Sequence, residues 1–455
     1  MGGALIRCYL LQPREGDPLV ENARQAGASI AYAEDDQRYR VLSNMIASAN
    51  IVIDALYGIG VKLPLRDDAA KLLRAAAAAL NDQSETPPLI NPTAESRRST
   101  RPYVLAVDCP SGLDCNTGDL DRFTLNADET LTFIGVKPGL LTFPGAAAVG
   151  ELRFSHLGIP ANMPELRSEK RFLVDGDDVQ ARLPSRPVDA HKGTFGSVLI
   201  VGGSGHYMGA PALAAKGAYA VGAGLVTIAA PAPITSALAP SMLETTWLPL
   251  PAHNERENVV IDASASEIVT DYIKQVDALV IGCGIGTHSS TEAFFFILLA
   301  HLKEQAHPTV ILDADALNML SSRSAWWNLL PSNTILTPHP GEMGRLCGLS
   351  TADVQKNRLE LAGEKSAAWQ CVVVLKGAHT SIAEPTGRVA ILPHKVPALA
   401  KAGTGDTLAG MIAGIASAGT NPFDAAICGA YLHASAGIKA MQHINPRSVL
   451  ASDLA

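Results

Sequence analysis

Short apolar runs alternate with helical patterns along most of the chain. The apolar runs are four to seven residues long and are bounded by turn residues, which is typical of buried strands. The segments between them carry apolar residues three or four positions apart, as amphipathic helices do. Repeated strand, loop and helix units predict a mostly parallel sheet with helices on its faces. Ligands of such sheets bind where the strands end, so the residues that follow each strand are the first candidates for a functional site.

The first 160 residues contain five predicted strands. They lie at 5–10, 50–55, 103–108, 129–133 and 151–154, with helices at 18–26, 37–49 and 67–80. The polar, proline-containing segment 81–100 predicts an exposed loop. Asp54 and Asp108 each end a predicted strand, and Ser111 follows the second one closely. Their oxygens suit a hard cation or ribose hydroxyls, although any one of them alone is better explained as an ordinary turn or cap residue.

The polar segment 161–170 predicts a linker between a first domain at 1–160 and a second domain at 171–455. In the second domain the apolar runs predict further strands, and a hairpin joins the last two. These strands lie at 197–201, 225–229, 277–281, 309–312, 334–337, 371–375, 380–383 and 388–392. Five of the loops that follow them carry a glycine or charged cluster. That concentration at one sheet edge is a stronger indication of a ligand site than any single residue.

Single residues of these loops have alternative explanations. Lys376 at a strand end beside a glycine favours a phosphate contact, in the manner of phosphate-clamping lysines. His339, between two prolines, is explained as a site residue or as an exposed loop histidine. Asp315 is explained as a site residue or as the cap of a helix over 316–320. Glu342 has a similar alternative, because a carboxylate near a helix N-terminus is favoured by the helix dipole.

Residues 401–419 predict a glycine-rich turn that runs directly into a helix. Leu408, Ile412 and Ile415 recur at helical spacing, and Gly419 ends the pattern. Gly410 and Gly414 lie four apart, so one helix face has almost no side chains and can approach a neighbouring element closely. The helix dipole and the free N–H groups of the first turn favour an anion at the N-terminus.

Asp406 lies at the start of this helix, where two roles are open. A carboxylate there is a common N-cap. It would equally serve as a base beside a phosphate bound by the N–H groups of the preceding turn. The short side chains of residues 402–405 leave room for a ligand, so we favour the anion site with Asp406 as the base.

Composition limits the class of protein. A net charge of −8 argues against a nucleic-acid partner, and 47 % hydrophobic residues with abundant alanine and glycine suit packed α/β layers. The seven cysteines form no CxxC pair, which predicts a reducing, cytoplasmic location and argues against a zinc site. No apolar run reaches the length of a membrane span, and the N-terminus lacks a signal pattern.

Three motifs of the first domain, IDALYGIGVKLPLR, VDCPSGLDCNTG and KPGLLTFPGAAAVGEL, resemble the epimerase domain of the NAD(P)H-hydrate repair enzymes. The resemblance implies a Rossmann-like three-layer αβα domain. It implies potassium ligands at Asp54 and Ser111. It also implies that hydrated nicotinamide nucleotide is bound by Asp108 and by the loop residues Gly58, Ile59, Gly60, Val61, Lys62, Leu63 and Pro64.

The chain departs from this family at its start. The family carries an Asn-Asn-Gly-Gly-Asp-Gly loop that holds the substrate phosphates and supplies a potassium ligand, and no such loop is present here. An anion cannot be held by N–H groups that are missing. We therefore expect the N-terminal domain to be truncated and without epimerase activity.

Seven motifs of the second domain resemble the dehydratase domain of the same family. They are HKGTFGSVLIVGGS, GAGLVTIA, VIGCGIG, ILDADALN, LTPHPGE, VLKGAHT and AGTGDTLAGMIAG. The resemblance implies a ribokinase-like fold and ADP- or ATP-dependent removal of water from the S form of hydrated NADH or NADPH. The family usually has a proline at the position of Cys283.

The resemblance also assigns residues. The hydrated nucleotide would contact Ala223, Gly286, His339 and Asp406. The adenine nucleotide would contact Lys376, Gly377, Ala378, His379, Thr380 and Gly405. Mg²⁺ would bridge the nucleotide oxygens, in part through Glu342 by way of water.

Family members are commonly oligomeric, so a homo-oligomer is expected. A small-alcohol kinase on the same fold and a non-catalytic nucleotide-binding scaffold remain as alternatives, and the choices between ADP and ATP and between the NADH and NADPH hydrates stay open.

Overall fold

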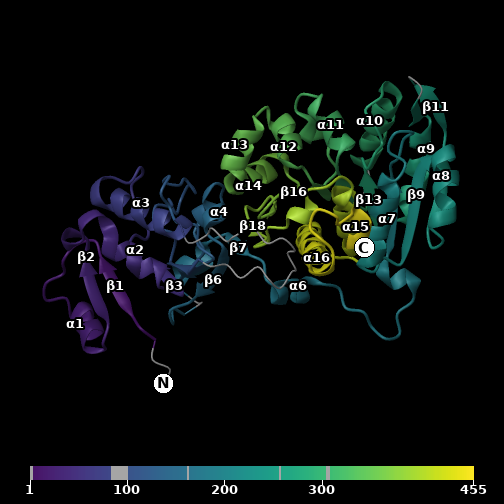
Figure 1. Cartoon of the computed structure of the whole chain (residues 1–455). Helices are drawn as coiled ribbons and strands as arrows, with labels where there is room; N and C mark the ends of the chain where they lie inside the picture. The colour runs from purple at the N-terminus through teal and green to yellow at the C-terminus, as the bar shows by residue number, and fades with distance from the viewer. Residues whose placement is uncertain (1–3, 83–100, 161–162, 256–257, 304–307) are drawn as a thin grey trace, which may run out of the picture. The chain divides into compact units, whose positions relative to one another are not determined.

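The computed structural model describes residues 4–82, 101–160, 163–255, 258–303 and 308–455 (Figure 1). It divides into two compact units, Met1–Leu166 and Arg167–Ala455. Most of the predicted segment 81–100 lies outside the described residues.

The first unit contains all five strands that the apolar pattern predicts. Its helices are α1 (Pro18–Gln25), α2 (Arg40–Ala47), α3 (Asp67–Asp82) and the short α4 (Gly145–Ala148) and α5 (Pro164–Ser168). Its strands are β1 (Arg7–Leu10), β2 (Ser29–Tyr32), β3 (Ile51–Asp54), β4 (Tyr103–Val107), β5 (Glu129–Phe133) and β6 (Glu151–Ser155). The sequence reading missed β2, because four half-exposed residues give no apolar run.

Strands β3, β4, β5 and β6 form one parallel sheet in that order, while β1 and β2 form a separate parallel pair. Helices α2 and α3 bury Leu42 and Leu73 against Val104 and Ala106 on one sheet face. On the opposite side of β3, Ile51 and Ile53 are 60 % and 62 % exposed. The α/β class is confirmed, and within the described residues the second helical layer of this unit is incomplete.

The second unit is built on a ten-stranded sheet in the order β10-β9-β8-β13-β14-β15-β16-β17-β18-β7. All neighbours from β10 to β16 are parallel. In the predicted hairpin, β17 is antiparallel to β16 and to β18, and β18 pairs in parallel with β7. The strands are β7 (Arg171–Leu173), β8 (Ser197–Val201), β9 (Leu225–Pro231), β10 (Thr246–Leu250), β13 (Ala278–Ile281), β14 (Thr309–Leu312), β15 (Thr334–Leu336), β16 (Val372–Leu375), β17 (Ser381–Ala383) and β18 (Val389–Ile391).

A separate hairpin of this unit pairs β11 (Ala252–Glu255) with β12 (Asn258–Ile261). Its helices are α6 (Gly176–Arg182), α7 (Ala210–Ala220), α8 (Ala232–Leu238), α9 (Ala265–Tyr272), α10 (Ser289–Lys303), α11 (Asp315–Ser321), α12 (Pro340–Cys347), α13 (Thr351–Lys356), α14 (Arg358–Trp369), α15 (Thr404–Ala416) and α16 (Pro422–His443). The sequence reading missed β7, β10, β11 and β12, which are short, polar or interrupted by proline.

Helices α7 and α15 pack with almost no space between their backbones (Figure 1). A Cβ atom at Gly410 would lie 1.8 Å from the carbonyl oxygen of Ala214, and one at Gly414 would lie 2.6 Å from a methyl group of Val221. The predicted side-chain-free face is therefore confirmed. Because any larger residue there would push α15 outward, this packing fixes the position of the helix tip that carries Asp406.

All seven cysteines carry free thiols. None of the described helices combines the length and the apolar character that crossing a membrane requires.

Candidate active site at the carboxyl edge of the large sheet

Charged side chains from three neighbouring strand ends meet at the carboxyl edge of the large sheet. Asp313 and Lys376 directly follow β14 and β16, and Glu342 lies in the first turn of α12, the helix that follows β15. The ammonium nitrogen of Lys376 lies 2.7 Å from an oxygen of Asp313 and 3.7 Å from an oxygen of Glu342. Burial disfavours the charged form of Lys376, but the two carboxylates outweigh it and raise the pKa of the lysine. The lysine is therefore a charged centre held between two acids.

The tip of α15 points at this cluster. Gly403, with φ 89°, is the N-cap of α15, and no side chain caps the helix. Asp406 is therefore the third helical residue, and the alternative in which it is a plain N-cap is wrong. A Cβ at Gly405 would lie only 3.3 Å from the nitrogen of Lys376, which shows how closely the first turn approaches the cluster. The N–H of Thr404 donates to the carbonyl of Lys401 at 3.4 Å. The N–H groups of Gly405 and Asp406, which have no partner within the helix, are available to an anion at this point.

The carboxyl group of Asp406 is mostly buried and has few stabilising donors. Burial raises its pKa to about 7, and the negative charge of Asp313 contributes in the same direction. Its hydrogen bond with the thiol of Cys283 and the charge of Lys376 only partly offset these effects. A carboxyl group with a pKa near neutral can take up a proton during a reaction, as a general base must.

His339 and Glu342 form the capping box of α12. The ring nitrogen Nδ1 of His339 accepts hydrogen bonds from the backbone N–H groups of Gly341 and Glu342, and the carboxylate of Glu342 accepts one from the N–H of His339 at 2.7 Å. His339 is half exposed, and burial lowers its pKa. Burial also raises the pKa of Glu342 to about 7. Both residues therefore cap a helix and face the site at the same time.

Asp315 does not cap α11, because Ala314 occupies the N-cap position. Its carboxylate instead accepts a hydrogen bond of 2.9 Å from the backbone N–H of Gly286. This contact ties the loop after β13 to the loop after β14, and so holds Gly286 near the cluster. The cap explanation considered for Asp315 is wrong for this reason.

Ala223 does not join the cluster. It lies between the end of α7 and the beginning of β9, where it is buried in the core. Because β9 runs parallel to its neighbours, the beginning of the strand lies at the amino edge of the sheet, away from the strand ends that carry Asp313 and Lys376.

The loop 376–380 turns sharply between β16 and β17. Gly377 has φ 144°, and the hydroxyl of Thr380 accepts from its N–H and donates to its carbonyl. His379 is buried, and burial lowers its pKa to about 4, so its ring is neutral at pH 7. Ala378 completes the loop. Three of the predicted nucleotide contacts lie close together. Lys376 and Gly377 are consecutive residues of this loop, and Gly405 at the tip of α15 approaches the side chain of Lys376.

The first unit holds a second set of acids at strand ends. Ser111 donates to the carboxylate of Asp54 from its backbone N–H at 2.8 Å and from its hydroxyl at 2.5 Å, and the hydroxyl accepts from the N–H of Tyr57. Burial raises the pKa of Asp54. Asp108 forms an ion pair with Lys137. Sequence reasoning missed Lys137, although it stands in the third motif, KPGLLTFPGAAAVGEL.

The loop that the resemblance assigns to the hydrated nucleotide, residues 58–64, is half-exposed to exposed throughout. A Cβ at Gly58 or Gly60 would meet nothing within 4 Å. The loop begins four residues after Asp54, so it starts near the acid that Ser111 holds.

Cys283, Asp313 and Asp406 place one potential metal-ligand atom each within 4.8 Å of one another. This donor set suits Mg²⁺ poorly, because Mg²⁺ takes oxygen ligands and a thiol is soft. Asp313 is moreover already paired with the ammonium of Lys376.

Sequence reasoning selected neither Asp313 nor Cys283. The rule that residues directly after strands are candidates would have found Asp313.

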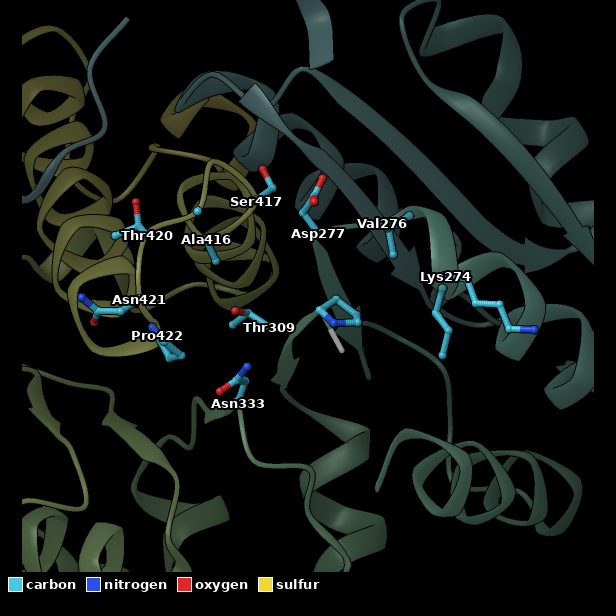
Figure 2. A pocket seen from close by; sticks show the side chains of 13 residues that line it. Lys274, Val276, Asp277, Thr309, Asn333, Ala416, Ser417, Thr420, Asn421 and Pro422 are labelled. Atoms are coloured by element: carbon cyan, nitrogen blue, oxygen red, sulfur yellow. The ribbon is translucent and has the colours of Figure 1, made fainter. Parts of the chain in front are cut away.

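A cavity of about 610 Å³ lies at the other edge of the same sheet (Figure 2). It is lined by residues that precede β13, β14 and β15, among them Asp277, Thr309 and Asn333, and by the end of α15 and the start of α16. Because it opens at the amino ends of these strands, it is separate from the cluster around Lys376.

Comparisons with known proteins identify relatives over both units. A family model described as NAD(P)H-hydrate dehydratase matches residues 198–455, and one described as YjeF-related protein N-terminus matches residues 6–139. A Bifunctional NAD(P)H-hydrate repair enzyme Nnr of Moorella thermoacetica is 38 % identical over 99 % of this chain and 81 % of its own length. The Escherichia coli enzyme of the same name is 28 % identical over 99 % of this chain and 78 % of its own.

Solved structures match the second unit. The ADP/ATP-dependent NAD(P)H-hydrate dehydratase of Bacillus subtilis, co-crystallised with ATP and Mg²⁺, has a TM-score of 0.52 and 33 % identity, and covers 61 % of this chain and 92 % of its own. A ribokinase-like superfamily protein of Enterococcus faecalis has a TM-score of 0.54 and 24 % identity over 63 % of this chain and 93 % of its own. The latter likeness concerns the fold alone, and it agrees with the ribokinase-like class predicted for the second unit.

Proposed function

The chain belongs to the family of bifunctional NAD(P)H-hydrate repair enzymes, and from this we propose that it converts (6S)-NAD(P)H hydrate to NAD(P)H with consumption of ADP or ATP. The observation that carries the proposal is the position of Asp406. This acid has a raised pKa, lies in the first turn of α15, and is adjacent to the charged pair of Lys376 and Asp313.

The hydroxyl group of the hydrate is a poor leaving group. In the proposed reaction Asp406 accepts the proton of this hydroxyl as it attacks the terminal phosphoryl group of the nucleotide. The oxygen–phosphorus bond to the remaining nucleotide breaks, and the hydroxyl becomes a phosphate ester. The lone pair of the ring nitrogen then expels that phosphate, and loss of a ring proton leaves NAD(P)H. Atoms balance as hydrate plus ADP giving NAD(P)H, AMP and phosphate.

The tip of α15 and the loop after β16 would stabilise the negative charge of the phosphoryl group and the nucleotide. The N–H groups of residues 403–405 would hold the transferred phosphoryl group, as electrostatic stabilisation requires donors aimed at the developing charge. Lys376, Gly377, Ala378, His379, Thr380 and Gly405 would hold the nucleotide. Gly286 and His339 would contact the hydrate from the loops after β13 and β15. The contact expected of Ala223 remains a prediction that its buried position at the other edge does not support.

Magnesium would neutralise the charge of the nucleotide phosphates. The described residues fit an ion held mainly by phosphate and water. Glu342 can contribute only partly to holding this ion, because one of its two carboxylate oxygens already accepts a hydrogen bond from the N–H of His339. The homo-oligomer and the cytoplasmic location expected from the sequence remain predictions.

In the first unit, Asp54 and Ser111 fit a potassium ion, since they offer buried oxygens and a carboxylate whose pKa burial has raised. The absence of epimerase activity remains a prediction. The test is conversion of R to S hydrate by the purified protein, followed by chiral separation. A normal turnover rate would contradict the prediction.

The test of the dehydratase is loss of the hydrate's absorbance with ADP or ATP supplied in turn. Mass spectrometry of the products provides the control, because a small-alcohol kinase would leave a stable phosphorylated product. Turnover that yields NAD(P)H, the spent nucleotide and free phosphate supports the proposal. A nucleotide-dependent thermal shift with no turnover of either hydrate would favour a binding protein instead.

A further inference from the structure

Arg358 is a buried cation without an acidic partner among the described residues. It is 2 % exposed and begins helix α14. Its guanidinium donates to three neutral oxygens, the side-chain oxygen of Gln355 at 3.1 Å and the carbonyls of Leu375 at 3.1 Å and Lys376 at 3.3 Å. Its Nε–H has no hydrogen-bond partner in the described part of the chain. Burial lowers its pKa to about 10, so the group is still charged at pH 7.

This arrangement lowers stability in three ways. A charge that is buried without a counter-ion loses its hydration and gains no ion pair. The positive end of the helix dipole is unfavourable for a cation at the first residue of α14. The unpaired Nε–H loses a hydrogen bond that water would have made. Folding stability alone therefore does not account for an arginine at this position.

The hydrogen-bond acceptors of Arg358 show which part of the chain it orients. Leu375 and Lys376 directly precede the loop proposed to hold the nucleotide. In a planar trans peptide the carbonyl and the following N–H point in opposite directions. Because the carbonyl of Lys376 faces the guanidinium, the N–H of Gly377 faces away from it. A Cβ at Gly377 would lie 2.9 Å from the guanidinium, so only glycine allows this approach.

Lys376 and Arg358, two of the cations of this region, differ in their charge balance. The ammonium of Lys376 is paired with Asp313 at 2.7 Å, which offsets most of its charge. The guanidinium of Arg358, in contrast, contacts only neutral oxygens in the described part of the chain. Arg358 therefore leaves positive charge for a bound anion.

We propose that Arg358 is a positioning residue for the nucleotide: its guanidinium orients the peptides that lead into the loop 376–380, and its unpaired charge is neutralised by the polyphosphate of ADP or ATP. The inference rests on the proposed function only in that the loop binds a nucleotide. Arg358 itself lies behind the loop and need not touch the ligand.

The experiment compares Arg358→Met with Lys356→Met. Lys356 is an exposed cation two residues away, so its substitution changes the net charge equally without touching the loop. We expect Arg358→Met to weaken binding of ADP and ATP about ten- to hundredfold, because the loop loses the hydrogen bonds from a charged donor that orient its peptides. The KM for the hydrate should stay within about twofold of wild type. Lys356→Met should change neither value. Calorimetry measures the nucleotide affinity, and steady-state kinetics measure both KM values.

A purely structural role would give a different pattern. It would lower the melting temperature of the nucleotide-free protein and leave nucleotide affinity unchanged, or raise both KM values together. Salt dependence adds a second readout, because nucleotide affinity should fall less steeply with salt in Arg358→Met than in wild type. Unchanged nucleotide affinity in Arg358→Met overturns the inference.

Arg358→Lys covers the case in which the methionine variant does not fold. Lysine keeps the charge but cannot bond two carbonyls through a fixed fork. We expect nucleotide affinity between those of wild type and Arg358→Met, and a value equal to wild type overturns the positioning role. Because nucleotide binding is measured without hydrate, a failure of this inference can be told apart from a failure of the proposed function. A wild-type protein that binds nucleotide but turns over no hydrate contradicts the proposed function and leaves this inference standing.

Discussion

The two units each gather acids at the carboxyl edge of a parallel sheet, but the acids are held differently. In the first unit, Asp54 receives two hydrogen bonds from Ser111, and Asp108 is paired with Lys137. In the second unit, Asp406 has a thiol as its hydrogen-bonding side-chain partner and a second acid, Asp313, nearby. Satisfied carboxylates suit the binding of a cation or a ligand. A carboxylate that is buried and under-satisfied suits proton transfer.

The comparison is tested most strongly by Asp406→Asn. The amide cannot accept the proton of the hydroxyl, so we expect turnover to fall by about two to four orders of magnitude, the usual worth of a positioned base. Nucleotide binding should persist, because the tip of α15 keeps its N–H groups. The decay of hydrate absorbance measures turnover, and the nucleotide-dependent thermal shift measures binding. Asp271→Asn, an exposed acid paired with Lys274, is the control. Turnover like that of wild type would remove Asp406 from the mechanism.

Lys376→Met should have the next largest effect. Removing one member of a buried ion pair leaves the other charge uncompensated, which costs about 3–5 kcal/mol of the free energy of unfolding. Urea denaturation measures this loss. The double variant Lys376→Met with Asp313→Asn should recover part of the stability, because no uncompensated carboxylate then remains at position 313. A single variant as stable as wild type would show that the pair is not buried as the structure has it.

The pH dependence of turnover should report the raised pKa of Asp406. Because the base must be ionised, kcat should rise with pH and level off above about 7, and fall about tenfold per unit well below that pH. The pH–rate profile measures this. A profile that is flat between pH 5 and 8 would contradict the assignment.

The raised pKa of Asp406 also makes folding stability depend on pH. Stability should fall with rising pH, whereas turnover should rise. The folded state binds the proton of Asp406 more tightly than the unfolded state does, since burial raises the pKa from 3.8 to about 7. Glu342 is shifted from 4.5 in the same direction. The free energy of unfolding should therefore decline as pH rises from about 4 to about 7 through these two groups. Asp406→Asn should flatten this decline, which urea denaturation across that pH range would show.

The smallest effect is expected in the first unit. If Asp54 and Ser111 bind potassium, replacing Na⁺ by K⁺ at equal ionic strength should raise the melting temperature of this unit by a few degrees, because a ligand that binds only the folded state stabilises it. Asp54→Asn should abolish the difference between the two ions. An equal response to Na⁺ and K⁺ in the wild type would argue against the site.

The sequence by itself determined the α/β class, most strands of both units and the glycine-faced helix α15, because buried parallel strands and close helix contacts leave strong local patterns. It also placed Lys376 at a strand end and Asp406 at the start of a helix that follows a glycine-rich turn. Only the tertiary structure decided that Asp313 pairs with Lys376, that Cys283 contacts Asp406 and that Ala223 lies at the other edge. It also decided that Arg358 has no acidic partner among the residues that the structure describes. These facts depend on which side chains meet across loops distant in sequence, and on how much water burial removes from each charge, neither of which a local pattern encodes.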